Sequence, residues 1–163
     1  MRQVAAGRKW DEERGGMITD ILVVVNGSGS RNAVEQAFRA AQASSRKAKV
    51  LQILDSDLYH YGHNDLVSPR LNKQRFLLYI REQVLERGGA EAQELHDKAR
   101  TMGVSLEIDP VETDDMVSTV VAEATKGYEM IYLAREKKRL FPLLQKHLAT
   151  QLRKKFAGKV IEC

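Results

Sequence analysis

The residues best suited to hold a ligand form one short segment, Asn26-Gly27-Ser28-Gly29-Ser30. Glycine lets a backbone approach a ligand closely, and the N–H groups at the start of a helix attract anions. The same residues suit an ordinary tight turn, in which Ser28 or Ser30 caps the helix that follows. The segment is not a P-loop, because the pattern Gly-x4-Gly-Lys-Ser/Thr is absent. An anion site and a plain turn therefore both remain open.

No group of residues has the pattern of a catalytic or metal site. The motifs Gly-x-Ser-x-Gly and His-Glu-x-x-His are absent, and the single cysteine, Cys163, is the last residue. His60 and His63 lie near several aspartates, but their spacing fits no standard set of metal ligands. A solvated polar loop over residues 59–69 explains them. We therefore expect neither enzyme activity nor a bound metal.

Alternating strand and helix patterns surround this segment and place it at the end of the first strand. Residues 21–25 (Ile-Leu-Val-Val-Val) are continuously apolar, which is typical of a strand buried on both faces. We predict strands over residues 19–25, 48–54, 104–111, 129–134 and 159–163. We predict helices over residues 30–45, 72–102, from a cap at Asp114 or Asp115 to Gly127, and 137–156. This order predicts an α/β fold: an open, mostly parallel five-stranded sheet with helices on both faces, a Rossmann-like or flavodoxin-like three-layer sandwich.

Glycine and proline mark the boundaries of several of these elements. Gly88 and Gly89 interrupt the long helix over residues 72–102, where we expect a kink or a break. Gly103 is a suitable helix stop. Pro110 places the end of the third strand at a sheet edge or beyond its pairing, and Pro142 is tolerable in the first turn of the last helix.

The totals indicate one globular domain. The chain has 163 residues, of which 29% are charged and 43% are hydrophobic. Residues 1–16 show no periodicity and are interpreted as a flexible N-terminal arm, and residues 17–163 as a single domain. Apolar runs reach only five residues, against the roughly 20 that a membrane span needs, and the arm lacks the apolar part of a secretory signal. With one cysteine, no intrachain disulfide forms, which fits a cytoplasmic location.

Positive charge is concentrated at the C-terminal end. Residues 135–163 hold nine Lys/Arg and two Asp/Glu, so this part carries +7 and the remainder −3 of the overall +4. A basic helix could bind an anionic polymer. No aromatic residues are interleaved and no known nucleic-acid motif is present, so we expect a solvated helix face and no nucleic-acid partner.

Several stretches together resemble the universal stress protein family, over residues 18–163. They are residues 21–28 (Ile-Leu-Val-Val-Val-Asn-Gly-Ser), 33–41, 48–51 (Ala-Lys-Val-Leu), 99–104 (Ala-Arg-Thr-Met-Gly-Val) and 128–133. The resemblance implies a fold in which some family members bind ATP. Those members use an aspartate that ends the first strand and a segment Gly-x2-Gly-x9-Gly-Ser/Thr after the fourth strand. Here Asn26 replaces the aspartate. The glycine positions fall on Ala134, Lys137 and His147, followed by Leu148, and no glycine occurs between Gly127 and Gly158.

The resemblance therefore implies a regulatory or binding module that does not bind ATP in the family manner. It also implies a homodimer through the C-terminal strand, acting with an unidentified protein partner and without a cofactor. Two such strands could bring Cys163 of both copies together. The alternative is an adenine-nucleotide-binding protein with a non-standard phosphate loop, which would use Asn26, Gly27, Ser28, Leu54, Arg135 and Lys137. A third function, binding of anionic polymers by the basic helix, is also open.

Overall fold

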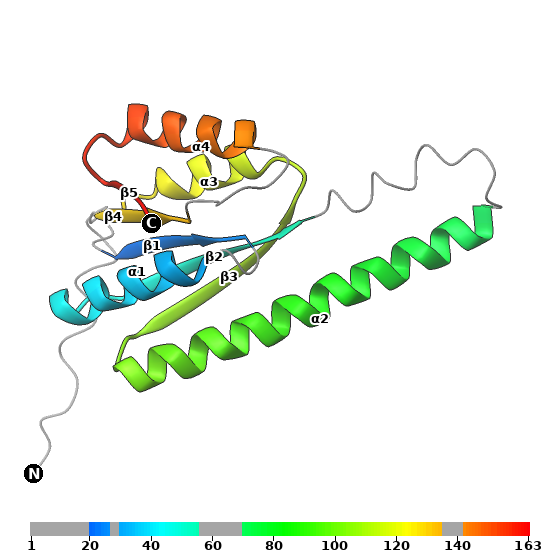
Figure 1. Cartoon of the computed structure of the whole chain (residues 1–163), viewed down its shortest axis with the longest axis horizontal. Helices are drawn as coiled ribbons and strands as arrows, with labels where there is room; N and C mark the ends of the chain where they lie inside the picture. Colours follow the sequence, from blue (N-terminus) through cyan, green and yellow to red (C-terminus); the bar gives the residue numbers. More distant parts are fainter. Residues whose placement is uncertain (1–19, 27–29, 56–69, 135–141) are drawn as a thin grey trace, which may run out of the picture.

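Helices cover both faces of the central sheet of the protein (Figure 1). The structure is a computed structural model that describes residues 20–26, 30–55, 70–134 and 142–163. The strands are β1 (Ile21–Val25), β2 (Ala48–Asp55), β3 (Leu106–Thr113), β4 (Met130–Leu133) and β5 (Val160–Glu162). The helices are α1 (Arg31–Ser44), α2 (Arg70–Met102), α3 (Met116–Ala124) and α4 (Pro142–Lys155).

All strand pairs in the sheet are parallel, and the strand order is β3-β2-β1-β4-β5. The predicted α/β fold with a five-stranded sheet and helices on both faces is confirmed. Its centre is β1, which pairs with β2 on one side and β4 on the other. Each of its five residues is buried, as the continuous apolar run predicts.

Two apolar clusters, one on each face of the sheet, form the core. On the face covered by α1 and α2, Val23 and Val25 pack with Phe38, Leu95 and Ala99. On the other face, the strand residues that alternate with these pack against α3 and α4. This cluster includes Leu22, Val24, Leu51, Val120, Ile131, Leu148 and Leu152. The alternation of side chains along each strand thus supplies both layers.

The expected kink at Gly88-Gly89 is absent, and α2 runs without a break. Gly88 explains why, because it lies against β2. A Cβ atom built on it would be 2.8 Å from Leu54 Cδ2, and its carbonyl accepts a hydrogen bond of 2.9 Å from Gln52 Nε2. The glycine therefore permits a close helix–sheet contact, and this contact compensates for the poor helix propensity of glycine.

The ends of the elements differ slightly from the prediction. Gly103, at a φ of +67°, ends α2, and the Val104 N–H donates to the Ala99 carbonyl at 2.9 Å. Because the N–H of Val104 belongs to this turn and does not pair with β2, β3 begins two residues later than predicted. Pro110 lies within β3, which is an edge strand as expected. Pro142 is the first residue of α4, and residues 137–141 lie outside the described part of the chain.

None of the helices in the described residues combines the length and apolar character needed to cross a membrane.

Candidate functional site

The carboxyl ends of β1 and β4 form the natural position for a ligand in this sheet. The chain leaves β1 toward β2, on one side, and later returns to β4, on the other side. In open α/β sheets, ligands bind at such a switch point, beyond the carboxyl ends of the strands. Of the described residues, Asn26 stands directly after β1 and Ala134 directly after β4.

Asn26 is held by two contacts within the protein. Its backbone N–H donates to Ser30 Oγ at 3.1 Å, and its Nδ2 lies 3.5 Å from the sulfur of Met116. The thioether is a weak acceptor. The side chain of Asn26 is therefore uncharged and directed toward the first turn of α3.

Ser30 precedes α1, but its hydroxyl does not cap the helix. Ser30 is thus the N-cap residue of α1 by position, as predicted, but its side chain makes no capping hydrogen bond. Its buried hydroxyl instead accepts from Asn26 and closes the turn between β1 and α1. Ser28, the other predicted cap, lies outside the described residues.

The first turn of α3 is fixed by local hydrogen bonds. Asp115 is the predicted N-cap and accepts from the Ser118 N–H at 3.0 Å. Hydrogen bonds from the side chain and then the backbone of Ser118 lower the pKa of Asp115. Thr113 Oγ1 in turn accepts from the Asp115 N–H at 3.0 Å. Met116 follows immediately, so these bonds position the sulfur over Asn26.

The other residues of the predicted nucleotide site are distributed differently. Leu54 packs on Gly88 of α2, whereas the side chain of Asn26 contacts α3, so the two side chains lie on opposite faces of the sheet. Gly27, Ser28, Arg135 and Lys137 lie outside the described residues, as do His60 and His63. Within the described ranges, no group of three or more His, Cys, Asp or Glu could hold a metal ion.

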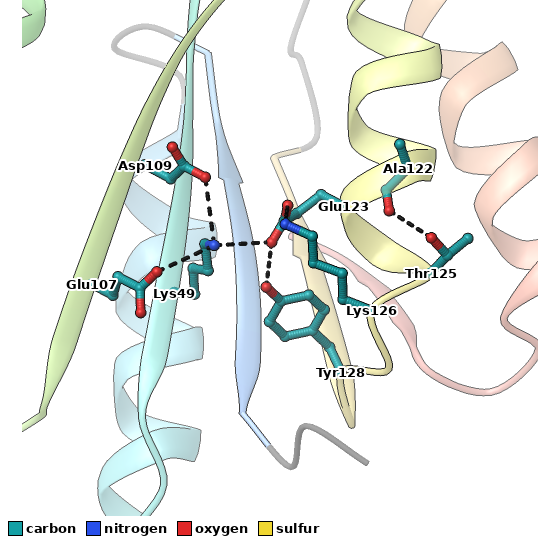
Figure 2. Close-up of polar contacts among 8 residues, drawn as sticks. All are labelled: Lys49, Glu107, Asp109, Ala122, Glu123, Thr125, Lys126 and Tyr128. Carbon is teal, nitrogen blue, oxygen red and sulfur yellow. Dashed lines mark hydrogen bonds and ion pairs between the residues drawn. The ribbon is translucent and has the colours of Figure 1, made fainter. Parts of the chain in front are cut away.

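A polar cluster that was not among the predicted site residues lies between the sheet and α3 (Figure 2). Lys49 of β2 forms ion pairs with Glu107 at 3.2 Å and Asp109 at 3.4 Å, both on β3, and with Glu123 of α3 at 3.1 Å. The Lys49 side chain is only 14% exposed and that of Glu123 only 7%. Burial of these charges is tolerated because each has several partners.

Glu123 is the centre of this cluster. Its second oxygen is 2.6 Å from the ammonium group of Lys126, and the Tyr128 hydroxyl donates to the first. Burial alone would raise the pKa of Glu123, but the hydrogen bonds from Lys126, Tyr128 and Lys49 outweigh it and lower the pKa. Glu123 is therefore ionised at neutral pH.

Both buried partners of Glu123 are protonated at neutral pH. Burial alone would lower the pKa of Lys49, but hydrogen bonds to Glu123 and Glu107 raise it above the ordinary value. Burial and the bond to Glu123 raise the pKa of Tyr128. A protonated lysine and a protonated phenol are poor nucleophiles and bases at neutral pH, so the cluster fastens α3 to β2 and β3. Two positions in the sequence could have indicated buried charges. Lys49 lies inside a predicted buried strand, and Glu123 lies between the apolar residues Val120 and Ala124 of a predicted helix.

Comparison with known proteins identifies the fold. A universal stress protein family member from Burkholderia pseudomallei superposes with a TM-score of 0.64 at 15% identity, covering 90% of this chain and 96% of the other. Universal stress protein UspA from Lactobacillus plantarum gives 0.64 at 14%, covering 90% and 98%. A universal stress protein in complex with cAMP gives 0.54 at 16%, covering 91% and 98%. No protein-family model and no curated protein matches the sequence. The chain thus has the universal stress protein fold.

Proposed function

We propose that this chain is a regulatory or binding module, without enzyme activity, that acts in the cytoplasm and does not bind ATP in the family manner. The observation that carries the proposal is the environment of Asn26. A neutral amide stands at the end of β1, and it is engaged with Met116 of the protein itself. A ligand there would lack a carboxylate to accept from ribose hydroxyls. The absence of glycine between Gly127 and Gly158 further disfavours a backbone cradle for phosphates.

The module would form a homodimer through β5, which is an edge strand. The Lys159 carbonyl and the Cys163 N–H both bond to β4. Because successive residues of a strand point in alternate directions, the N–H groups of Val160 and Glu162 point away from β4. A second β5, related by a twofold axis, could pair with them antiparallel. An unidentified protein partner would then bind the dimer.

A second function, binding of an adenine nucleotide, is favoured by the similarity to the stress protein in complex with cAMP. The Asn26 side-chain oxygen can still accept a hydrogen bond, and a monophosphate needs fewer backbone donors than a triphosphate. Such a ligand would contact Asn26, Gly27, Ser28 and Leu54, with Arg135 and Lys137 as side-chain partners for phosphate.

Nucleotide release decides between the two functions. Protein purified without added nucleotide is denatured, and the supernatant is analysed by chromatography for AMP, ADP, ATP and cAMP. Isothermal titration with ATP and with cAMP follows. We expect less than a tenth of an equivalent of nucleotide and no heat of binding at 1 mM ligand. A stoichiometric yield, or a dissociation constant below about 100 μM, would establish the second function instead.

Asn26→Asp is the informative variant, because it supplies the missing carboxylate and leaves the rest of the loop unchanged. We expect that it also binds no ATP, since the phosphate segment is still without glycine. Tight ATP binding by this variant would show that the residue at position 26 alone separates the two classes.

A further inference from the structure

The N-terminal half of α2 extends past the sheet (Figure 1), and it carries large apolar side chains that are exposed. Gly88 contacts Gln52 and Leu54, close to the end of β2 at Asp55. Arg81 still pairs with Glu112 of β3 at 3.5 Å. Residues 70–80 therefore lie beyond the last of these contacts, over about 15 Å at 1.5 Å per residue. Four side chains of this half are about half exposed: Phe76 51%, Leu78 59%, Tyr79 57% and Leu85 47%.

Six exposed residues of this half form one line along the helix, which we call the α2 stripe: Arg75, Leu78, Tyr79, Glu82, Leu85 and Glu86. Their spacing of i, i+3, i+4, i+7, i+10 and i+11 places them on a single face. The residues between them, Leu77, Ile80 and Val84, are half-buried, and Gly88 continues their face onto β2. The stripe consequently points away from the sheet.

The apolar part of the stripe is comparable to the largest exposed patch of a typical monomeric protein. Leu78, Tyr79 and Leu85 together offer on the order of 300 Å² of apolar surface per chain, since large side chains present 150–250 Å² each when fully exposed. The largest exposed patch of a monomer, about 300–600 Å² in most proteins, is often functional.

The charges of the stripe favour a second copy of the same helix as its partner. They are complementary when the two α2 helices run antiparallel. When a second α2 runs antiparallel with its centre between residues 80 and 81, Arg75 faces Glu86 and Tyr79 faces Glu82. Leu78 comes next to Leu85. Twofold symmetry produces each of these pairs twice. A parallel pair would instead place Glu82 on Glu82 and Glu86 on Glu86, which is unfavourable.

We propose that the α2 stripe is a homotypic interface, in which two copies of this chain pair antiparallel through their α2 helices. This contact is separate from any pairing of β5, which is the opposite edge strand from β3, and it does not depend on it. Its length implies a total buried area of about 1,000 Å², at the low end for specific interfaces. We therefore expect a dissociation constant in the micromolar range.

Sedimentation equilibrium tests the proposal in the full chain carrying Val160→Pro. This substitution removes a β5 N–H that points away from β4, so that any remaining dimer forms elsewhere. We expect a dimer at 50 μM. Leu78→Glu and Leu85→Glu should each convert it to a monomer, because each places two carboxylates in the leucine contact. Circular dichroism confirms that each variant is folded.

A charge exchange distinguishes pairing from a general loss of structure. Arg75→Glu and Glu86→Arg, made separately, should each weaken the dimer at least tenfold, because like charges then face each other twice. The two combined should restore the dissociation constant to within about threefold. Arg87→Glu reverses an exposed charge outside the stripe and should have little effect.

Cysteine cross-linking tests the register. Arg75→Cys combined with Glu86→Cys, in a chain with Cys163→Ser, should form a disulfide-linked dimer on mild oxidation. Either cysteine alone should not, because residues 75 and 75 of two antiparallel helices lie about 16 Å apart along the axis. A monomer at 100 μM, leucine variants that leave the mass unchanged, or a charge exchange that fails to restore pairing would overturn the proposal.

Discussion

At the scale of single residues, the most informative feature is the charged cluster around Glu123, which lies inside a sheet–helix contact. Lys49 reaches three carboxylates, and Glu123 receives Lys49, Lys126 and Tyr128. Every charge that is removed from water here has partners. The cost of breaking one contact should therefore depend on how deeply the removed group is buried.

Glu123→Gln should lower the free energy of unfolding by about 2–3 kcal/mol, because it leaves the largely buried ammonium group of Lys49 with less compensation. Glu107→Gln removes another partner of the same lysine, but Glu107 is 65% exposed, so the loss should stay below about 1 kcal/mol. Urea denaturation of both variants measures the difference. Equal losses would contradict the assigned role of Glu123.

The contribution of Glu123 to stability should also depend on pH. The pKa of Glu123 is lower in the folded protein than its ordinary value of 4.5, so the unfolded chain takes up the proton first as pH falls. Its stabilisation is complete above about pH 5 and is lost in more acidic solution. The difference in unfolding free energy between wild type and Glu123→Gln should hence be constant from pH 6 to 8 and shrink below pH 5. A difference that grows in acid would be contrary to this sign.

At the scale of elements, α2 and β2 are joined where a glycine removes a side chain. Gly88 lies against Leu54 and bonds to Gln52, whereas a Cβ built at Gly89 meets nothing within 4 Å. The two adjacent glycines thus have different reasons to be there. Only the first is required by packing.

Gly89→Ala should therefore stabilise the protein by about 1 kcal/mol through helix propensity alone. Gly88→Ala brings the same propensity, but Leu54 must rotate away from the new methyl group, so its stability should be lower by about 1 kcal/mol or more relative to Gly89→Ala. Thermal and urea unfolding of both variants check this order. If the two alanines stabilise equally, the contact with Leu54 is not tight.

The order of the elements could be predicted from the sequence because it depends on local patterns. The apolar run of β1 and the stripe Val34, Ala37, Phe38 and Ala41 of α1 are visible without knowledge of any neighbour. Contacts between distant segments could not be predicted. Asn26 was identified as a site residue, but its contact with Met116 joins residues 90 positions apart.

The same reason explains the other differences. Glu123 meets Lys49 only because β2 lies next to β3 and α3 crosses that face, which no residue in either segment reveals. From the sequence alone, Gly88 was expected to interrupt the helix, because its contact with β2 is not visible there. The hydrogen bond of the Ser30 hydroxyl could not be predicted either, since a serine at this position can cap the helix or close the preceding turn.

At the scale of the whole molecule, the two proposed self-contacts lie on different parts of the protein. The β5 edge is one border of the sheet, and the α2 stripe belongs to the helix that packs near the other border. Each contact has its own twofold axis. If both form, the assembly is larger than a dimer, and it closes as a tetramer only when the two axes are perpendicular and intersect.

Interruption of the α2 stripe alone should leave the β5 dimer. A chain with Leu78→Glu should sediment as a dimer at 50 μM, and adding Val160→Pro should convert it to a monomer, because proline removes an outward N–H of β5. Ala90→Glu, at an exposed position of α2 outside the stripe, adds the same single negative charge and serves as the control. A Leu78→Glu chain that is already monomeric would refute pairing through β5.

The length of α2 also has a mechanical meaning. The helix has 33 residues, and Leu95 and Ala99 of its C-terminal half are fixed in the core. Its other half contacts β2 at Gly88 and, beyond that, reaches the sheet through the solvent-exposed ion pair of Arg81 with Glu112, so it can act as a lever with its fulcrum at Gly88. A tilt of roughly 10° about that point displaces the far end by about 5 Å, given a rise of 1.5 Å per residue. Gln52 and Leu54, which touch the fulcrum, belong to the end of β2, beside the switch point of the sheet. A small displacement at that end of the sheet would be amplified at the tip of the lever.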